Sequence, residues 1–337
     1  MTARAPLILP MILPLTLAVS LLAAATLPGW VENGYYVDIA SQMLISGIFA
    51  LGLNILVGHA RLVSLGHAAL FGVACYVPAI LVAGGTGHLA AAILSVLSVL
   101  ALAAVIGVLA LRATGIGFLM ITLACGQILW GVAYRWISVT NGENGLNLAA
   151  RPMPFGLSLA SSTAFYFATL AVFLAVLAAM AVFAGSPFGA SLRGTRDQPR
   201  RMTALGYNVW LIRFLAFLIS GLLTALSGLL FLYYNQFVSP HSLALATSAE
   251  AVLMVIVGGA GTLFGPVIGA VIVVAIKTIA SAYVEHWNLV LGAVFVAIII
   301  FMPDGLVPGL GRLSRALSAG RRVPVLSVRP SKLEDAR

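Results

Sequence analysis

Charge is what this sequence has least of. Only 8% of its 337 residues are charged, whereas 61% are hydrophobic and the mean hydropathy is +1.10. Long windows contain no Asp, Glu, Lys or Arg, among them 5–31, 62–111, 152–192 and 214–249. Each window can hold at least one apolar helix of about 20 residues, the length that crosses the hydrocarbon core of a bilayer. A soluble globular domain is therefore excluded, and a helical membrane protein with several crossings is predicted.

Motifs of common catalytic and nucleotide sites are also missing. The chain has no Gly-Lys pair, hence no Walker A loop, and no His-Glu-x-x-His, Cys-x-x-Cys or Gly-x-Ser-x-Gly pattern. The two cysteines, Cys75 and Cys125, lie in apolar runs and are expected to be core residues. Glu250 and Lys277 are the ionisable candidates inside apolar stretches of the second half, and both are expected near helix ends. We expect no catalytic residue, no metal site and no cofactor in this chain.

The net charge of +9 comes from arginines and lysines in the connections and in the tail. Seven of the eighteen basic residues follow Leu310. Basic residues at the ends of membrane spans are typical of the cytoplasmic side, so nucleic-acid binding is not predicted. The tail, residues 311–337, is expected to be cytoplasmic and disordered.

The apolar runs predict an all-α polytopic membrane protein with about 8–10 transmembrane helices. A retained first helix is expected at 7–28 rather than a cleaved signal peptide, because the run is long and many spans follow. Arg4, Arg61, Arg112 and the arginines at 193–201 can all be placed in the cytoplasm. With a cytoplasmic N-terminus, six crossings return the chain to the cytoplasm at Ser186. The predicted spans are 7–28, 39–57, an apolar segment ending near 83, 89–111, 116–136, 163–184, 210–234, and the two stretches 249–280 and 287–302.

Two full crossings after 249 would leave the basic tail outside. The conflict disappears if the stretch 257–266, which we call the glycine break, divides the first stretch into two short helices or a re-entrant pair. It contains four glycines and a proline. In a helix interior, each glycine costs about 1 kcal/mol and a proline about 3 kcal/mol relative to alanine. Residues 66–72 resemble residues 259–265, which raises the possibility of an inverted repeat with interrupted helices beside a substrate path.

Several polar residues within these runs have two readings. His67 either lines a pathway or donates a hydrogen bond to the backbone, and the two are equally compatible with its glycine-rich surroundings. Thr122 and Gln127 either contact a polar solute or make a structural hydrogen bond between helices, which is the more common role.

The densest charge between apolar runs lies in residues 186–208, which must be in water. This segment contains Arg193, Arg196, Asp197, Arg200 and Arg201. Ser186-Pro187 is typical of a helix start, and Gly206 is typical of a helix end.

The sequence resembles the permease subunits of branched-chain amino acid ABC importers. The resemblance covers roughly residues 35–310 and is specific in order and spacing. It is carried by 62–72, 118–124 with Gln127 and Ile128, 140–146, Ser186-Pro187-Phe188-Gly189 through 204–208, and 258–266. The family usually has an acidic residue and paired alanines before the glycine, whereas this chain has Pro199-Arg200-Arg201-Met202.

The resemblance implies a transmembrane permease domain over 1–310, with segment 186–208 as the cytoplasmic loop that docks on an ATPase subunit. The expected coupling residues are Arg193, Arg196, Asp197, Arg200, Arg201 and Gly206. The expected translocation path is formed by Ser64, Gly66, His67, Thr122, Gln127, Gly258, Gly259, Gly261 and Thr262.

The resemblance also implies partners: a second permease subunit, two ATP-binding subunits and a periplasmic or extracellular solute-binding protein. ATP would be bound by the partners, and the chain would lie in the bacterial cytoplasmic membrane among lipids. The implied substrates are leucine-like amino acids, urea or short amides. The alternatives are a self-sufficient secondary transporter or channel for a small polar solute, and a membrane-embedded enzyme, which the lack of clustered His, Asp and Cys disfavours.

Overall fold

The computed structural model describes residues 34–148, 151–152 and 159–283, together with isolated residues between 289 and 309. The predicted span 7–28, most of the predicted span 287–302 and the tail 311–337 lie outside the described residues.

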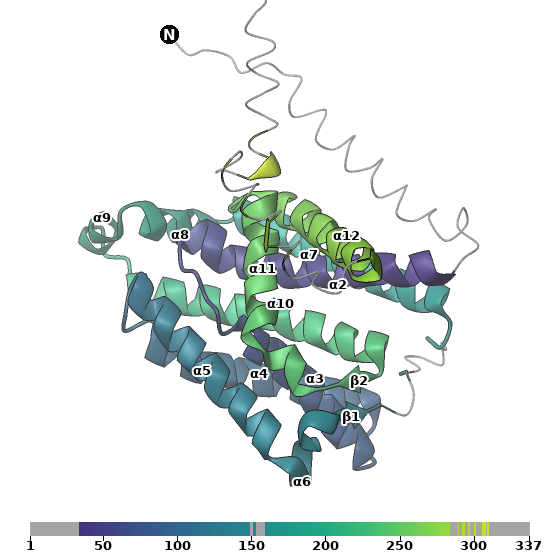
Figure 1. The fold of residues 1–337 in the computed structure, drawn as a ribbon. Helices are drawn as coiled ribbons and strands as arrows, with labels where there is room; N and C mark the ends of the chain where they lie inside the picture. Colours follow the sequence, from purple (N-terminus) through teal and green to yellow (C-terminus); the bar gives the residue numbers. More distant parts are fainter. Residues whose placement is uncertain are drawn as a thin grey trace, which may run out of the picture.

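The described chain is almost entirely helical (Figure 1). Its elements follow one another as α2 (Gly34–Asn54), η1 (Ile55–Ala60), α3 (His67–Ala83), α4 (His88–Ala110), α5 (Ile116–Arg135), α6 (Ile137–Thr140), η2 (Gly142–Asn144), β1 (Leu146–Asn147), α7 (Ser162–Gly185), α8 (Pro187–Asp197), α9 (Pro199–Ala204), α10 (Val209–Asn235), β2 (Phe237–Val238), η4 (Pro240–Leu243), α11 (Leu245–Gly258) and α12 (Gly265–Tyr283).

Six of these helices are long and apolar enough to cross a membrane: α2 with η1, α4, α5, α7, α10 and α12. The apolar helices α3 and α11 are shorter, with 17 and 14 residues. The predicted all-α polytopic fold is therefore confirmed. The predicted spans between 39 and 234 each correspond to one of these helices, and the boundaries differ by a few residues.

The centre of the bundle is the continuous helix formed by α2 and η1. It contacts α7, α10, α11 and α12, and 83% of its apolar window is buried, compared with 22% in α5. Among the six long helices, α10 has the next highest buried share, and it packs against α2, α3 and α4. The outer helices α4, α5 and α7 leave apolar side chains exposed, among them Leu97, Ile128 and Val182. Such all-round apolar surfaces are typical of helices that face lipid or another membrane subunit.

The third apolar segment begins with a non-helical stretch before its helix α3. The π-helical turn η1 ends at Arg61, which has a positive φ of 53°. Residues 61–66 follow without helical structure, and α3 begins at His67, whose side chain is fully buried. Helix α3 is short because this irregular stretch covers part of the depth of the bundle.

The predicted interruption at the glycine break is confirmed. Helix α11 ends at Gly258 and α12 begins at Gly265, and Gly259 and Gly261 have φ of 115° and 81°. The chain then returns along α11, because Gly265 lies against Gly258 and Gly269 lies against the carbonyl of Met254. The stretches 66–72 and 259–265 differ locally, since a helix begins at the second residue of the first and at the last residue of the second. The predicted correspondence between them therefore does not extend to local structure.

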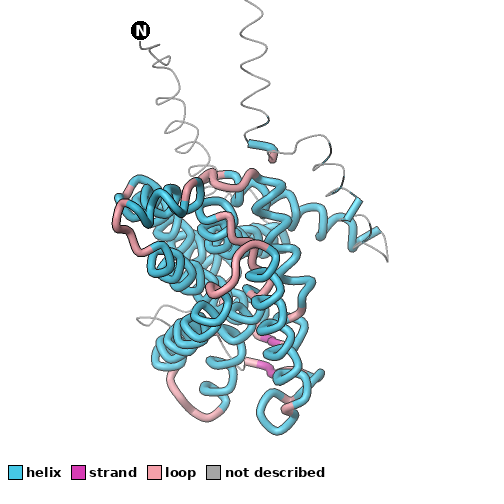
Figure 2. The backbone as a smooth tube through the Cα atoms, turned by 90° about the vertical axis from the view of Figure 1, so that its left-hand side faces the viewer, coloured by secondary structure: helices cyan, strands magenta, loops and turns pink. Residues whose placement is uncertain are grey.

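The two ends of the bundle carry different structures. At one end α8 and α9 project beside the start of α10 (Figure 1). Toward the other end, β1 and β2 form a two-stranded antiparallel sheet in which Leu146 pairs with Val238 (Figure 2). This sheet ties the connection after α5 to the connection after α10. Arg151 reinforces it by donating to the carbonyls of Tyr233 and Tyr234 at 3.0 and 3.2 Å.

The close approach of α11 and α12 gives a testable expectation. A methyl group at Gly269 would meet the Met254 carbonyl, so Gly269→Ala should lower the free energy of unfolding by about 1–3 kcal/mol, as overpacking does. Gly185→Ala is the matched control, because a methyl group there has no neighbour within 4 Å. Thermal unfolding in detergent should show a lower midpoint for Gly269→Ala alone. Equal midpoints would contradict the packing described.

Candidate functional site

A buried chain of hydrogen bonds holds the non-helical stretch 61–66 in place. The Ser64 Oγ and His67 Nδ1 atoms are 2.8 Å apart, and His67 Nε2 is 2.8 Å from Ser220 Oγ in α10. Ser220 donates its hydroxyl proton to the Gly52 carbonyl at 2.7 Å. Because a hydroxyl has one proton, His67 Nε2 must carry the proton shared with Ser220. Both ring nitrogens of His67 have a hydrogen-bond partner.

Helix α5 completes this arrangement. The backbone N–H of Leu65 donates to Thr122 Oγ1 at 3.3 Å, and Thr122 donates in turn to the Leu119 carbonyl at 2.9 Å. Gly66 lies directly against the Thr122 carbonyl, where a methyl group would not fit. Ser64, His67 and Thr122 are all 0% exposed. His67 thus bonds to two side chains and not to the backbone, and Thr122 bonds to the non-helical residue Leu65 and to its own helix.

A second set of hydrogen bonds fixes the glycine break against the end of α2. Asn54 donates from Nδ2 to the Thr262 carbonyl at 2.9 Å and accepts from the Gly261 N–H at 2.8 Å. Thr262 donates to the Gly259 carbonyl at 2.8 Å and accepts from the Gly265 N–H at 3.0 Å, which caps the start of α12. Asn54 was not predicted from the sequence. Its signal is a side-chain amide in the largely apolar run 43–58, where unpaired polar groups are costly.

The glycines of the break permit close backbone contact. A methyl group at Gly258 would overlap the Gly265 carbonyl, and one at Gly58 would overlap Gly261. Gly58, Gly258 and Gly261 thus bring η1, the end of α11 and the start of α12 together.

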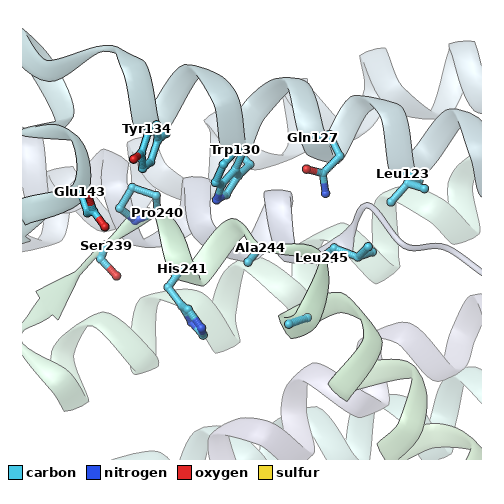
Figure 3. Close-up of a pocket in the computed structure, with 11 residues that line it drawn as sticks. Leu123, Gln127, Trp130, Tyr134, Glu143, Ser239, Pro240, His241, Ala244 and Leu245 are labelled. Atoms are coloured by element: carbon cyan, nitrogen blue, oxygen red, sulfur yellow. The ribbon is translucent and has the colours of Figure 1, made fainter. Parts of the chain in front are cut away.

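A groove of about 730 Å³ lies between α5 and the segment that leads into α11 (Figure 3). Leu123, Gln127, Trp130 and Tyr134 form its α5 wall, and the spacing of three and four residues places them on one face of the helix. The opposite wall contains Ser239, Pro240, His241 and the residues 244–246, and Glu143 lies at one end. Of the nine predicted path residues, all of which the structure describes, Gln127 lines this groove. The other eight lie in the two hydrogen-bonded sets and the glycine break.

The sequence analysis did not identify the other groove residues. In α5 the available signal was the regular spacing of Leu123, Gln127, Trp130 and Tyr134. The opposite wall had no such signal, since it is brought to α5 by the fold.

The segment 186–208 forms two short helices held to the bundle by arginines. Arg193 donates to the Ala184 carbonyl at 2.7 Å, and Arg196 donates to the Gly58 carbonyl at 3.0 Å. Arg213 of α10 adds a bond to the Thr195 carbonyl at 3.1 Å. The predicted coupling arginines thus divide into two groups, because Arg200 and Arg201 are exposed on α9.

The ends of these helices follow the predicted punctuation. Ser186 accepts from the Gly189 N–H at 3.1 Å and caps α8, with Pro187 in the first turn. Gly206 has a φ of 85°, and the Tyr207 N–H reaches back to the Met202 carbonyl at 3.1 Å, as in a helix that ends at a left-handed glycine. The predicted helix end at Gly206 is confirmed.

Asp197 forms an exposed ion pair with its neighbour Arg196 at 2.8 Å. The hydrogen bond from the Arg196 side chain is the main reason that the pKa of Asp197 lies below its usual value, and the positive charges of Arg196 and Arg61 add to the effect. The bond also fixes the guanidinium that reaches the Gly58 carbonyl.

Glu250 and Lys277 do not lie near helix ends, contrary to expectation. Glu250 is the sixth residue of α11, and Lys277 lies six residues before the end of α12. They face each other as an ion pair with a distance of 3.0 Å. The helix limits were misjudged because α11 begins at Leu245 and α12 continues to Tyr283. Among the described residues, no group of three or more His, Cys, Asp or Glu side chains is arranged to hold a metal ion.

The buried imidazole allows a direct test. His67→Ala would leave the Ser64 and Ser220 hydroxyls with lost partners, so the free energy of unfolding should fall by about 1–3 kcal/mol per unsatisfied group. His88→Ala is the control, because the buried Nδ1 of His88 has no hydrogen-bond partner in the described structure. Thermal unfolding in detergent should separate the two variants, and an equal shift would contradict the role of His67.

The two groups of arginines should also differ. Arg196→Ala removes the bond to Gly58, so amide hydrogen exchange in residues 187–204 should become faster, whereas Arg201→Ala should leave it unchanged. Faster exchange in both variants would show that Arg201 also holds the segment.

Comparison with known proteins agrees with this architecture. The profile of a family described as branched-chain amino acid transport system / permease component matches residues 35–299. The chain is 29% identical to the high-affinity branched-chain amino acid transport system permease protein LivM of Salmonella typhimurium over 86% of this chain and 73% of the relative. It is 28% identical to LivM of Escherichia coli, over 87% and 74%, and 21% identical to LivH of Escherichia coli, over 77% and 90%.

No solved structure matches the chain significantly. The family match nevertheless begins at the start of α2 and runs through the non-helical stretch, the groove, the segment 186–208 and the glycine break. The chain is therefore a multi-pass membrane protein that belongs to the family of permease components of branched-chain amino acid transport systems.

Proposed function

We propose that this chain is one of two permease subunits in an ABC importer of the bacterial cytoplasmic membrane. ATP is bound and hydrolysed by two partner subunits, and this chain provides no cofactor site. An external solute-binding protein delivers the substrate, a branched-chain amino acid. Urea and short amides are the smaller candidates of the same transport class. Family membership and the relatives named LivM and LivH support this proposal.

The observation that carries the proposal is the connection between α8 and the membrane helices. Arg196 binds the Gly58 carbonyl, and Gly58 lies against Gly261 of the glycine break. A displacement of α8 by a docked ATPase would therefore act directly on η1 and on the α11–α12 junction. Because Arg200 and Arg201 on α9 are exposed, they remain available to an acidic groove on such a partner.

We propose that the groove on α5 is the half of the translocation path that this chain supplies. The walls supplied by this chain leave it open, and apolar side chains of α5 beside it are exposed, including Met120, Ile128 and Val132. A second permease subunit placed against this face would close the groove and cover these side chains. Rocking of the two subunits would then open the path alternately to each side.

One observation favours a second candidate function. An ion pair inside apolar helices, such as Glu250–Lys277, is a common feature of ion-coupled carriers. Liposomes that contain this chain alone and an ion gradient should show no leucine uptake if the importer proposal holds. Uptake without partners and ATP would support the self-sufficient carrier instead.

Docking can be tested with charge reversals on α9. Arg200→Glu and Arg201→Glu should each reduce co-purification of the ATPase subunits and lower ATP-driven leucine uptake about tenfold, since like charges across an interface cost several kcal/mol. Arg112→Glu is the matched control, as it is an exposed arginine outside segment 186–208. Normal assembly and uptake in both α9 variants would refute the docking surface.

A further inference from the structure

Glu250 and Lys277 form an ion pair with unusual surroundings. Lys277 Nζ is 3.0 Å from both carboxylate oxygens of Glu250. The side chains retain 18% and 32% exposure, although both belong to apolar helices that pack against the core of the bundle. Ionised groups are expensive at such positions, and an apolar pair of similar size is often at least as stable. The pair therefore calls for an explanation other than stability of the fold.

The pair borders a small cavity of about 100 Å³ with two kinds of lining. Gln42 and Thr247 supply polar groups, and Phe49, Phe71 and Phe231 supply aromatic surface. The aromatic rings lie together, with centroid distances of 4.9 Å between Phe49 and Phe71 and 5.0 Å between Phe71 and Phe231. A site with two opposite charges beside an aromatic wall is complementary to a molecule that carries two opposite charges and an apolar group.

The cavity adjoins the groove on α5. His241 lines both of them, and Thr247, which lines the cavity, donates to the His241 carbonyl at 3.1 Å. A volume of about 100 Å³ holds roughly three water molecules, whereas small-molecule sites usually measure about 300–1,000 Å³. In this conformation the cavity can take the charged end of a small solute, and the rest of the molecule requires the adjoining groove.

We propose that the Glu250–Lys277 pair, the cavity beside it and His241 form the recognition site for the zwitterionic end of an apolar amino acid in the path. The substrate ammonium donates to the Glu250 carboxylate, and Lys277 donates to the substrate carboxylate. The internal ion pair is thus exchanged for two pairs with the substrate, and no charge is left unpaired. The apolar side chain extends into the adjoining groove, whose lining includes Leu123 and Trp130. This inference rests on the proposed importer function and names the chemistry that its path would select.

The test uses the complete importer in liposomes. The binding protein is added outside the vesicles, and ATP is enclosed inside them, on the side of the ATPase subunits. Glu250→Met combined with Lys277→Met replaces the ion pair by two apolar side chains and leaves neither member of the pair as an unpaired polar group, so the helices should still pack. Uptake of radiolabelled leucine should fall at least tenfold, while ATP hydrolysis stimulated by the binding protein stays within twofold of the wild type. Thr278→Val, one residue beyond the pair and outside the cavity lining, is the control and should leave uptake unchanged.

Uptake within twofold of the wild type in the double variant would overturn this inference and leave the importer function standing. Absence of ATP-driven leucine uptake by the wild-type importer would instead refute the proposed function itself.

A second measurement does not depend on the variant folding. Saturation-transfer NMR on the wild-type complex without its binding protein should show contact with leucine, but not with leucinamide or 4-methylpentanoate, each of which lacks one of the two charges. Equal signals from all three compounds would overturn the proposal.

Discussion

Backbone polar groups inside an apolar bundle must find partners, and two non-helical stretches of the described chain, residues 61–66 and the glycine break, depend on that constraint. At residues 61–66 the Leu65 and Gly66 N–H groups donate to the hydroxyls of Thr122 and Ser64. At the glycine break the partners are the two ends of the Asn54 amide. Irregular backbone at membrane depth is tolerated where protein groups satisfy it in this way. Five fully buried polar residues serve these two stretches: Asn54, Ser64, His67, Thr122 and Ser220.

The same two stretches connect the segment 186–208 to the buried helices of the bundle. Arg196 binds a carbonyl of η1, η1 touches the glycine break, and the break sets the position of α12 against α11. These contacts are short and made largely by backbone, which gives them little freedom to move independently. A rigid junction of this kind suits a protein whose movement is driven by a partner, because a displacement at one end reaches the helices beside the groove.

Much of the fold could be predicted from hydrophobicity and punctuation. The charge-free windows predicted the long helices, Ser186-Pro187 and Gly206 predicted the limits of the segment 186–208, and the glycines and proline at 257–266 predicted the interruption. Each of these signals is local, since it depends on a residue's own backbone preferences or on the length of an apolar run. The roles of individual polar residues were less accessible. His67 and Thr122 were open to two readings because a sequence does not show which neighbour satisfies a buried hydrogen bond.

The sequence by itself determined that this is an all-α membrane protein, where its helices are interrupted, and which family it resembles. The tertiary structure alone decided which polar groups meet. It paired Asn54 with a loop more than 200 residues away, divided the arginines of 186–208 into two that anchor and two that are exposed, and brought Glu250 and Lys277 together. It also formed the groove, by placing residues 239–246 opposite α5. The physical reason is that helix formation responds to neighbouring residues, whereas hydrogen bonds, ion pairs and cavities depend on how distant helices pack.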